Sequence, residues 1–561
     1  MRNVKNLFGM AVMATALVAC SSNDDLTSNG SEGNQTGAAY ASFRINLPTT
    51  SGTRVAGDPT FDGGDAKEYE VKNGTILIFD NAGKFVTSAQ LGTMNPWTDV
   101  KSDGVTTAAI ATVKLSSDVT VGGDYQALVL LNNDAEAQTP KVTLPTTKGT
   151  PYATWSADFS KVNAEKYVST DGIFMANAPK YNGATSEPTT LVKVNNICAS
   201  REEAQAKAAT TVYVERGLAK VTMQNYKTDG YTIADGTTYA GDKVVITDWK
   251  LDVTNKSTYP VHQTGGLKTA WGEIWGEDRF ADAANTTFPR VYWGVDPNYS
   301  GNALQDLTKC QTAFNMIKNS EVEGQAGTDH PQYCLENTFD LANMMQGQTT
   351  RVVFKAVYTP KALKGTAEKT FYKIGNNTAI WTKANLEKQI HTVAVTAMGI
   401  TDATEQAKYV VKLDATENNI SGEAGQHLIK AKNITYTGEG TSQVNQNVVN
   451  KINEKLGLSE AAGIATYLNG EAYYIARIKH FNELTHWNAG QAYGSDNAAF
   501  LGRYGVLRNN WYDLSVNSIS GLGYPEVPEV KPTVPDDEND QYINVEVKIL
   551  DWAKRSQSID L

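Results

Sequence analysis

The chain has 561 residues, of which 41% are hydrophobic and 20% are charged. This length exceeds what one hydrophobic core organises, so we expect two folded domains. The formal net charge of -11 and the lack of any Lys/Arg cluster in the sequence exclude a nucleic-acid partner, because phosphate binding needs a cationic surface. Abundant Gly and Tyr, 46 and 26 residues, favour a β-rich fold over a helical bundle.

The first twenty residues have the features of an export signal. Arg2 and Lys5 give a basic start, residues 7–18 are apolar, and a small-residue cleavage site closes on Cys20. This ending resembles a lipobox, which implies cleavage before Cys20, lipidation of its thiol and anchorage to a membrane through acyl chains. The alternative is an ordinary secretory signal in which Cys20 stands by chance. Both alternatives predict export.

Residues 21–38 form a polar tether without apolar periodicity. Its start, Ser21-Ser22-Asn23-Asp24-Asp25, resembles the surface-export signal of Bacteroidetes lipoproteins, which implies delivery to the outer face of the outer membrane. No later segment of the sequence reaches the ~18 apolar residues of a membrane-spanning helix.

The first predicted strand covers residues 41–47, where apolar and polar residues alternate without interruption. Ala41, Phe43, Ile45 and Leu47 face one way, and Ser42, Arg44 and Asn46 face the other. Pro48 ends the strand, and a polar loop over residues 49–65 follows, which contains Arg54.

The body of the chain is predicted to consist of strands with a few helices. Residues 74–80 and 125–133 are apolar strands of the kind found in the centre of a sheet. Residues 202–209 favour a helix capped by Ser200, and a strand over residues 211–223 follows. Later strands are predicted over residues 243–248, 350–358, 409–413 and 506–519, and an amphipathic helix over residues 444–456.

The last part of the chain contains two contrasting segments. Residues 526–540 are rich in proline and acidic residues, which predicts an extended, solvated spacer that stays off the folded body. A strand is predicted beyond it, over residues 543–549. Its apolar face consists of Ile543, Val545, Val547 and Ile549, and Leu550 and Trp552 add further apolar area.

An amphipathic strand behind a spacer must pair with a sheet, its own or that of another molecule, because its apolar face and backbone groups are costly in water. Burying four such side chains contributes roughly 6 to 12 kcal/mol, and ordering seven or eight residues costs about as much. Firm binding therefore needs ladder hydrogen bonds and a preformed groove. Proteolysis after Arg54 would provide the groove, because it would release the first strand together with Cys20 and its lipid.

Several motifs occur in an order that resembles the Bacteroidales fimbrillins, the type V pilins of the FimA and short-fimbria (Mfa) kinds. They are the lipobox at Cys20; Gly52-Thr53-Arg54-Val55-Ala56-Gly57-Asp58, which is similar to the arginine maturation site; Leu128-Val129-Leu130-Leu131-Asn132-Asn133; Val214-Glu215-Arg216-Gly217-Leu218-Ala219-Lys220-Val221; Val506-Leu507-Arg508-Asn509-Asn510-Trp511-Tyr512; and Ile543-Asn544-Val545-Glu546-Val547-Lys548-Ile549-Leu550-Asp551-Trp552. The ending is most similar to the major subunit of short fimbriae.

The resemblance implies a mainly β fold with two transthyretin-like β-sandwich domains, a few short helices and a C-terminal donor strand. It divides the chain into a lipoprotein signal peptide (1–20), a propeptide with the removable strand (21–54), an N-terminal sandwich (55–222), a C-terminal sandwich (223–525), and a spacer with the donor strand (526–561). The displaced strand is that of Ala41, Phe43, Ile45 and Leu47, and the cut falls between Arg54 and Val55.

The resemblance also implies partners and a location. The chain would polymerise with copies of itself and join anchor and tip pilins, after an arginine-specific or trypsin-like protease has cut it. A stalk subunit is expected, because the sequence has both a maturation site and a donor strand. The lipidated precursor would lie in the outer membrane and the mature subunit in a surface fimbrium, where contacts with host or bacterial receptors would support adhesion and biofilm formation.

No enzymatic activity, cofactor or metal is expected. His480, Glu483 and His486 invite a metal hypothesis, but on a helix they would spread over an arc of ~120°, unlike the paired histidines of zinc proteases. Polar histidines beside packed aromatic residues are the favoured interpretation. The sequence leaves two states open for Cys198, Cys310 and Cys334. Either Cys310 and Cys334 form a disulfide, or all three are buried thiols.

The alternative function is that of a surface glycan-binding lipoprotein, because 10 Trp and 26 Tyr residues could form a sugar-binding platform. At strand spacing, however, aromatic residues more often belong to a core or an interface. An enzyme acting on glycans ranks third.

Overall fold

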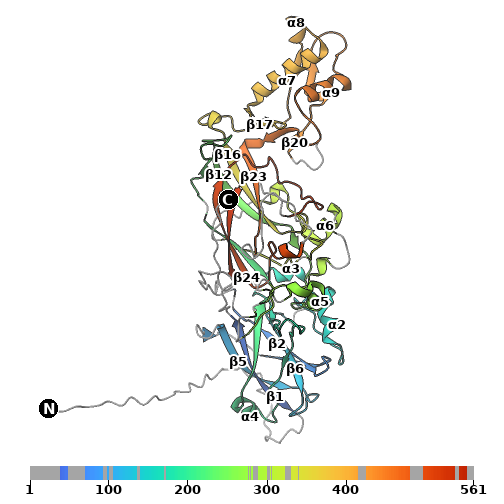
Figure 1. Cartoon of the computed structure of the whole chain (residues 1–561), viewed down its shortest axis with the longest axis vertical. Coiled ribbons are helices and arrows are strands. Elements are labelled where there is room, and N and C mark those ends of the chain that lie inside the picture. Colours follow the sequence, from blue (N-terminus) through green and yellow to red (C-terminus); the bar gives the residue numbers. More distant parts are fainter. Residues whose placement is uncertain are drawn as a thin grey trace, which may run out of the picture.

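The computed structural model describes residues 38–48, 68, 70–91, 98–99, 105–134, 139–169, 172–225, 227–275, 277, 280–281, 283, 288–299, 304, 306–322, 330–338, 340–414, 425–480, 497–536 and 543–551. The chain is mainly β, with several sheets and few helices, as the sequence predicts. Figure 1 shows an elongated molecule, with the first sheet at one end and a helical module at the other. No helix of the described segments combines the length and the apolar composition that crossing a bilayer requires.

The N-terminal sheet has the strand order β3-β2-β6-β7-β9-β1-β5-β4, with β8 paired to β6. In chain order these strands are β1 (Ala39–Pro48), β2 (Gly74–Asp80), β3 (Phe85–Gln90), β4 (Thr98–Asp99), β5 (Val105–Leu115), β6 (Tyr125–Leu131), β7 (Met175–Asn177), β8 (Val192–Lys193) and β9 (Thr210–Arg216). The predicted strands over residues 41–47, 74–80 and 125–133 are confirmed as β1, β2 and β6.

The two halves of this sheet enclose one core, to which Phe43 of β1, Ile76 of β2, Val129 of β6 and Val212 of β9 belong. The other face of β2 and β6 packs against α2 (Tyr152–Ser156) and α3 (Ala164–Tyr167), through a second core that includes Leu77 and Leu128. Because β2 and β6 are buried on both faces, their sequences are continuous apolar runs rather than alternating ones.

Two further sheets form a sandwich in the middle of the molecule. One has the order β15 (Gln332–Cys334), β10 (Ala219–Asn225), β24 (Asn510–Ile519) and β25 (Ile543–Asp551); the other has the order β11 (Tyr231–Thr232), β12 (Lys243–Asp252), β16 (Arg351–Thr359) and β23 (Glu471–Arg477). Val221 and Leu514 of the first sheet share a core with Trp249, Phe354 and Tyr474 of the second. β24 begins later than predicted, because Asn509 has a left-handed φ of 59°.

The strand predicted over residues 211–223 is in fact two strands in different sheets, which corrects the prediction. β9 ends at Arg216 and β10 begins at Ala219. At the break, the Gly217 amide donates to the Phe174 carbonyl at 2.8 Å. A Cβ at Gly217 would lie 3.0 Å from the ring of Phe174 and 3.0 Å from that of Tyr167, so a larger residue would press on both rings at this close crossing.

A helical module is inserted between β16 and β23 and lies at the far end of Figure 1. It contains β17 (Phe371–Ile374), β18 (Ile380–Trp381), α7 (Lys383–Met398), α8 (Ala403–Gln406), β19 (Tyr409–Val411), β20 (Gln426–His427), β21 (Ile434–Tyr436), α9 (Gln446–Lys455) and β22 (Ile464–Tyr467). Leu386 and Ile390 of α7 pack with Ile452 of α9. The predicted helix over residues 444–456 is confirmed as α9, whereas α7 was not predicted.

A second insertion, between β12 and β16, has its own aromatic core around Trp271, Tyr292 and Trp293. Its regular elements are β13 (Thr254–Asn255), α5 (Leu267–Trp271), α6 (Leu307–Ala313) and β14 (Phe314–Asn315), while α4 (Arg201–Ala206) belongs to the N-terminal half. Short 3-10 turns cover Phe159–Lys161, Gly272–Ile274, Pro297–Tyr299, Asn319–Glu321, Lys361–Leu363, Ala431–Asn433, Leu468–Gly470 and Asn497–Phe500.

The three cysteines of the described segments are free and buried. Cys310 lies in the core of the second insertion and Cys334 in the core of the sandwich, so they do not form the disulfide that the sequence left open. Burial raises the pKa of the Cys334 thiol to about 12, which keeps it protonated and unreactive.

The proline-rich segment is not the solvated spacer that its composition predicts. Val530 is 5% exposed and packs in the core of the second insertion, and Asp536 is fully buried. The prediction failed because composition says nothing of the hydrogen-bond donors that the folded body offers to the carbonyls of such a segment.

Candidate strand-exchange site

β1 occupies the interior of the N-terminal sheet, although it comes first in the chain. It pairs antiparallel with β5 from Ala39 to Leu47 and parallel with β9 from Phe43 to Asn46. Figure 1 shows β1 beside β5 at the end of the molecule away from the helical module. Removing β1 would leave the ladder edges of β5 and β9 unpaired and expose the core between them.

The inward face of β1 closes that core. Ala41, Phe43 and Ile45 are 0% exposed and Leu47 is 1% exposed, so the structure places the four predicted residues on one buried face. Three of these are large side chains, and burying them contributes roughly 5 to 9 kcal/mol.

The outward face of β1 is covered by α4 at Ser42. The Ser42 hydroxyl lies 2.9 Å from that of Thr112 on β5 and donates to the carbonyl of Ala204 in α4 at 2.8 Å. Ser200 caps the start of α4 as predicted, because its hydroxyl accepts from the Glu203 amide, but the helix ends at Ala206 and not at residue 209. Arg44, in contrast, is exposed.

The chain is held on both sides of the predicted maturation site. Upstream, Tyr40 and Cys198 exchange two backbone hydrogen bonds of 2.9 and 2.8 Å. Downstream, the Glu68 carboxylate lies 2.7 Å from the Lys220 ammonium and accepts from the Tyr333 hydroxyl at 2.6 Å. The Glu68 carbonyl accepts from Arg216 Nε at 2.9 Å. Cys20, Arg54 and Val55 lie outside the described residues.

β25 lies at an edge. It pairs antiparallel with β24, from Ile543 opposite Ile519 to Asp551 opposite Asn510. Among the described strands β24 is its one ladder partner. No described strand pairs with the other side of the β25 backbone, which makes β25 an edge strand of this sheet as far as the structure describes it. Of the predicted donor residues, Ile543, Val545, Val547, Ile549 and Leu550 belong to this strand, and Trp552 lies outside the described residues.

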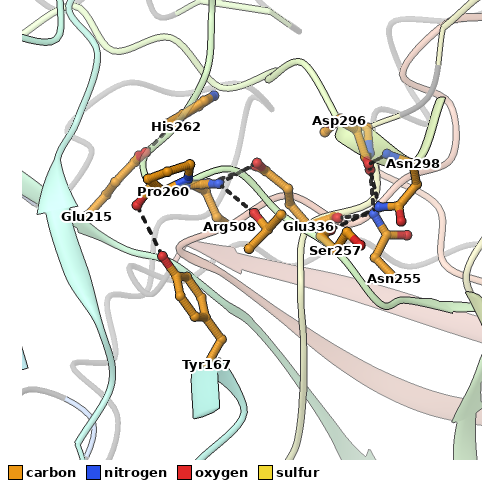
Figure 2. A network of polar contacts seen from close by, with 12 residues as sticks. Tyr167, Glu215, Asn255, Ser257, Pro260, His262, Asp296, Asn298, Glu336 and Arg508 are labelled. Carbon is orange, nitrogen blue, oxygen red and sulfur yellow. Dashed lines mark hydrogen bonds and ion pairs between the residues drawn. The ribbon is translucent and has the colours of Figure 1, made fainter. Parts of the chain in front are cut away.

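A buried polar junction joins the N-terminal sheet to the insertion that follows β12 (Figure 2). Glu215 of β9 lies 2.6 Å from His262 Nδ1 and 2.6 Å from Arg290 Nη2. Burial alone would raise the pKa of Glu215, but Arg290 and His262 outweigh it and hold the pKa at about 2. Glu215 is therefore an ion at neutral pH, although it is fully buried.

A second ion pair lies beside the first. Arg508 Nε donates to Glu336 Oε2 at 2.8 Å, and Arg290 Nη2 donates to the Arg508 carbonyl at 3.2 Å. The Tyr167 hydroxyl donates to the Pro260 carbonyl at 3.1 Å (Figure 2). Buried polar groups of the N-terminal half and of the C-terminal half thus form hydrogen bonds and ion pairs with one another. These bonds fix the orientation of the two halves.

Asp296 lies at the rim of the junction, and its pKa is shifted in the opposite direction to that of Glu215. It accepts from the Asn298 amide at 2.9 Å and from the side chain of Asn255. Burial, helped by the nearby Glu336 carboxylate, raises the pKa of Asp296 to about 7, although hydrogen bonds from Asn298 and Asn255 act in the opposite direction. No role was predicted from the sequence for the residues of the polar junction. The one available signal was the charged pair Glu215-Arg216 at the end of an apolar strand.

His480 is a buried structural residue. Its Nδ1 lies 2.7 Å from the Tyr512 hydroxyl on β24, and its backbone amide donates to the Arg503 carbonyl at 2.7 Å. Glu483 and His486 lie outside the described residues. Within the described part of the chain, no group of three His, Cys, Asp or Glu side chains could hold a metal ion.

Comparison with known proteins gives one family match. Residues 465–558 match the family model of the major fimbrial subunit protein type IV, fimbrillin, C-terminal. The matched range includes β23, β24 and β25, and thus the edge at which the last strand pairs. The match supports a role as a fimbrial subunit at the cell surface. No curated protein matches the chain.

The similar solved structures are distant. A Parabacteroides distasonis protein named for cell adhesion is 11% identical with a TM-score of 0.39, and the alignment covers 92% of this chain and 99% of that one. A fimbrial assembly protein of the same species is 12% identical with a TM-score of 0.28, covering 61% of this chain and 92% of that one. A Bacteroides thetaiotaomicron structure named for polysaccharide binding is 11% identical with a TM-score of 0.19, covering 71% and 99%.

Proposed function

We propose that the chain is a stalk subunit of a surface pilus that polymerises by donor-strand exchange. In this proposal the precursor is exported as a lipoprotein acylated at Cys20. An arginine-specific or trypsin-like protease cuts it after Arg54 and removes the lipid together with β1. The last strand of another copy then fills the vacated position, and the filament, with its anchor and tip pilins, supports adhesion and biofilm formation.

The observation that carries the proposal is the position of β1. An N-terminal strand in the middle of a sheet is joined to the rest of its domain by a single covalent connection, the one through Arg54. One cut there converts β1 from part of the chain into a separate peptide that is held by hydrogen bonds and apolar contacts alone. Glu68 keeps the new chain start anchored to the body after the cut.

The lengths and patterns of the two strands support the exchange. β1 has ten residues and β25 nine, and both alternate apolar and polar residues in sequence. The vacated position would present two unpaired ladder edges, whereas β25 on its own subunit has one ladder partner among the described strands, β24. Moving the strand from an edge to the interior of a sheet therefore gains ladder hydrogen bonds on a second side.

The test compares three proteins after treatment with an arginine-specific protease. The unmodified chain should form ladders on unheated gels and filaments in electron micrographs. The Arg54→Ala variant should remain uncut and monomeric. Deletion of residues 540–561 should allow the cut but prevent assembly. Normal assembly of the cut, truncated protein would disprove the donor-strand mechanism.

A further inference from the structure

The proline-rich segment before β25 is bound to the C-terminal half of the molecule along its length. We call residues 526–536 the strap. At its start, the Val527 amide donates to Asn319 Oδ1 at 2.6 Å. Arg351 Nη2 donates to the Pro528 carbonyl at 2.7 Å, and Arg351 is itself held by Asp252 at 2.8 Å. These contacts tie the strap to β16 and β12.

The second half of the strap pairs with the chain just before β16. The Gln346 amide donates to the Val534 carbonyl at 2.8 Å, and the Asp536 amide donates to the Met344 carbonyl at 3.2 Å. Met345 and Pro535 face each other as antiparallel bridge partners. The segment is therefore held by backbone ladder contacts, like a short strand.

Two close contacts make the placement specific. A Cβ at Gly347 would lie 2.9 Å from the Cα of Pro532, so only a glycine allows the strap to approach this closely. The Asp536 carboxylate is fully buried and accepts from the Thr349 hydroxyl at 2.7 Å. A buried carboxylate without hydrogen bonds would be strongly unfavourable, so the site selects this position of the strap.

We propose that the strap is a positioning element for strand exchange, which keeps the root of the last strand on its own subunit. Only the residues beyond Asp536 then pass to the neighbouring subunit. This inference rests on the donor-strand mechanism proposed above. Six residues, 537–542, separate Asp536 from Ile543. A chain of that length spans at most ~25 Å, so the acceptor position must open within that distance of Asp536. The strap thereby fixes the spacing of successive subunits.

The decisive experiment locks the strap to the body. In the double variant Met345→Cys, Pro535→Cys, the two cysteines replace bridge partners, whose Cα separation in an antiparallel pair suits a disulfide. After cleavage at Arg54, the oxidised protein should form filaments at the same rate as the reduced protein and as the matched control Pro535→Cys. If the oxidised protein stays monomeric and reduction restores assembly, the strap must leave the body, and the inference is wrong.

A second measurement uses the unmodified protein and is independent of whether the variants fold. The amides of Gln346 and Asp536 should exchange slowly with deuterium both in the uncut monomer and in the filament, because the strap contacts persist. Loss of this protection on assembly would overturn the inference. Deletion of residues 540–561 separates the two claims. If the truncated, cut protein assembles, the donor-strand mechanism itself fails; if truncation and the locked strap both prevent assembly, only the positioning role fails.

Discussion

β1 and β25 have similar lengths and the same alternation of residues, but the structure gives them opposite positions. β1 has a ladder partner on each side and closes a core, whereas β25 has one partner, β24, among the described strands. The alternation specifies that a strand has one apolar face. It does not specify how many neighbours the strand has. Removing β1 would break ladders on both of its sides and open a core, whereas removing β25 would break its ladder with β24.

The largest expected effect tests the interior position of β1. Phe43→Ala should lower the free energy of unfolding of the uncut precursor by about 3 to 5 kcal/mol, because it leaves a cavity in the core between β5 and β9. Urea denaturation would measure the change. The matched control is Arg44→Ala on the exposed face of the same strand, which should change stability by less than about 0.5 kcal/mol. Equal effects of the two variants would contradict the buried placement.

The second prediction uses pH to weaken the polar junction, where Glu215 at the end of β9 is paired with Arg290 and His262. The pKa of Glu215 is lowered from 4.5 to about 2, so the folded state favours its ionised form. The contribution of ionised Glu215 to the free energy of unfolding is fully present above pH ~4.5 and is lost as the pH falls towards 2. At ~1.4 kcal/mol per pH unit, the loss is about 3 kcal/mol.

This pH response would be measured by urea denaturation of the uncut protein between pH 7 and pH 2. Glu215→Gln should be less stable at neutral pH, because it leaves Arg290 buried without its counter-ion, and should show a flatter profile. A variant profile with the same slope as that of the unmodified protein would assign the acid response to other groups.

The third prediction concerns the edge position of β25. Val547→Ala in the uncut monomer alters a strand with one ladder partner among the described strands, so its effect should be smaller there than in the filament. In filaments the same substitution should lower the temperature of dissociation clearly, because the strand then lies in the interior of a neighbouring sheet. If Val547→Ala weakened the uncut monomer as much as the filament, the contrast between an edge strand and an interior strand would not hold.

The smallest expected effect concerns the cover on the outward face of β1. Ser200→Ala removes the N-cap of α4 and should cost about 0.5 to 1 kcal/mol. Because α4 packs on β1 through the Ser42–Ala204 contact, the released β1 peptide should also dissociate faster from the cut protein. Size-exclusion chromatography after cleavage would follow this release. An unchanged rate would show that α4 does not help to retain β1.

Local patterns were sufficient to predict several strands. The period-two alternation of residues 41–47 and 543–549 and the apolar runs at 74–80 and 125–133 each led to a strand in the structure. α7 was missed although its signals are local. Thr382 caps its start, Gly399 ends it with φ 74°, and Leu386 and Ile390 share a face.

The remaining features depend on partners far away in the sequence. Glu215 meets Arg290, and Arg508 meets Glu336, across separations that no local pattern encodes. The strap was predicted as solvated because its prolines and acidic residues favour an extended chain. In the structure the strap instead turns between Lys531 and Val534. Arg351 and Gln346 bind its carbonyls.

If the chain polymerises as proposed, the polar junction has a mechanical consequence in a filament under tension. Pulling force would enter each subunit at the position between β5 and β9 and leave through the strap. The covalent route between these points crosses at Gly217, where β9 ends and β10 begins. The buried ion pairs Glu215–Arg290 and Arg508–Glu336 stabilise the chain where it crosses from β9 to β10. The subunit should therefore behave as a stiff rod, whose resistance is set by the shearing of β-ladders rather than by bending at a hinge.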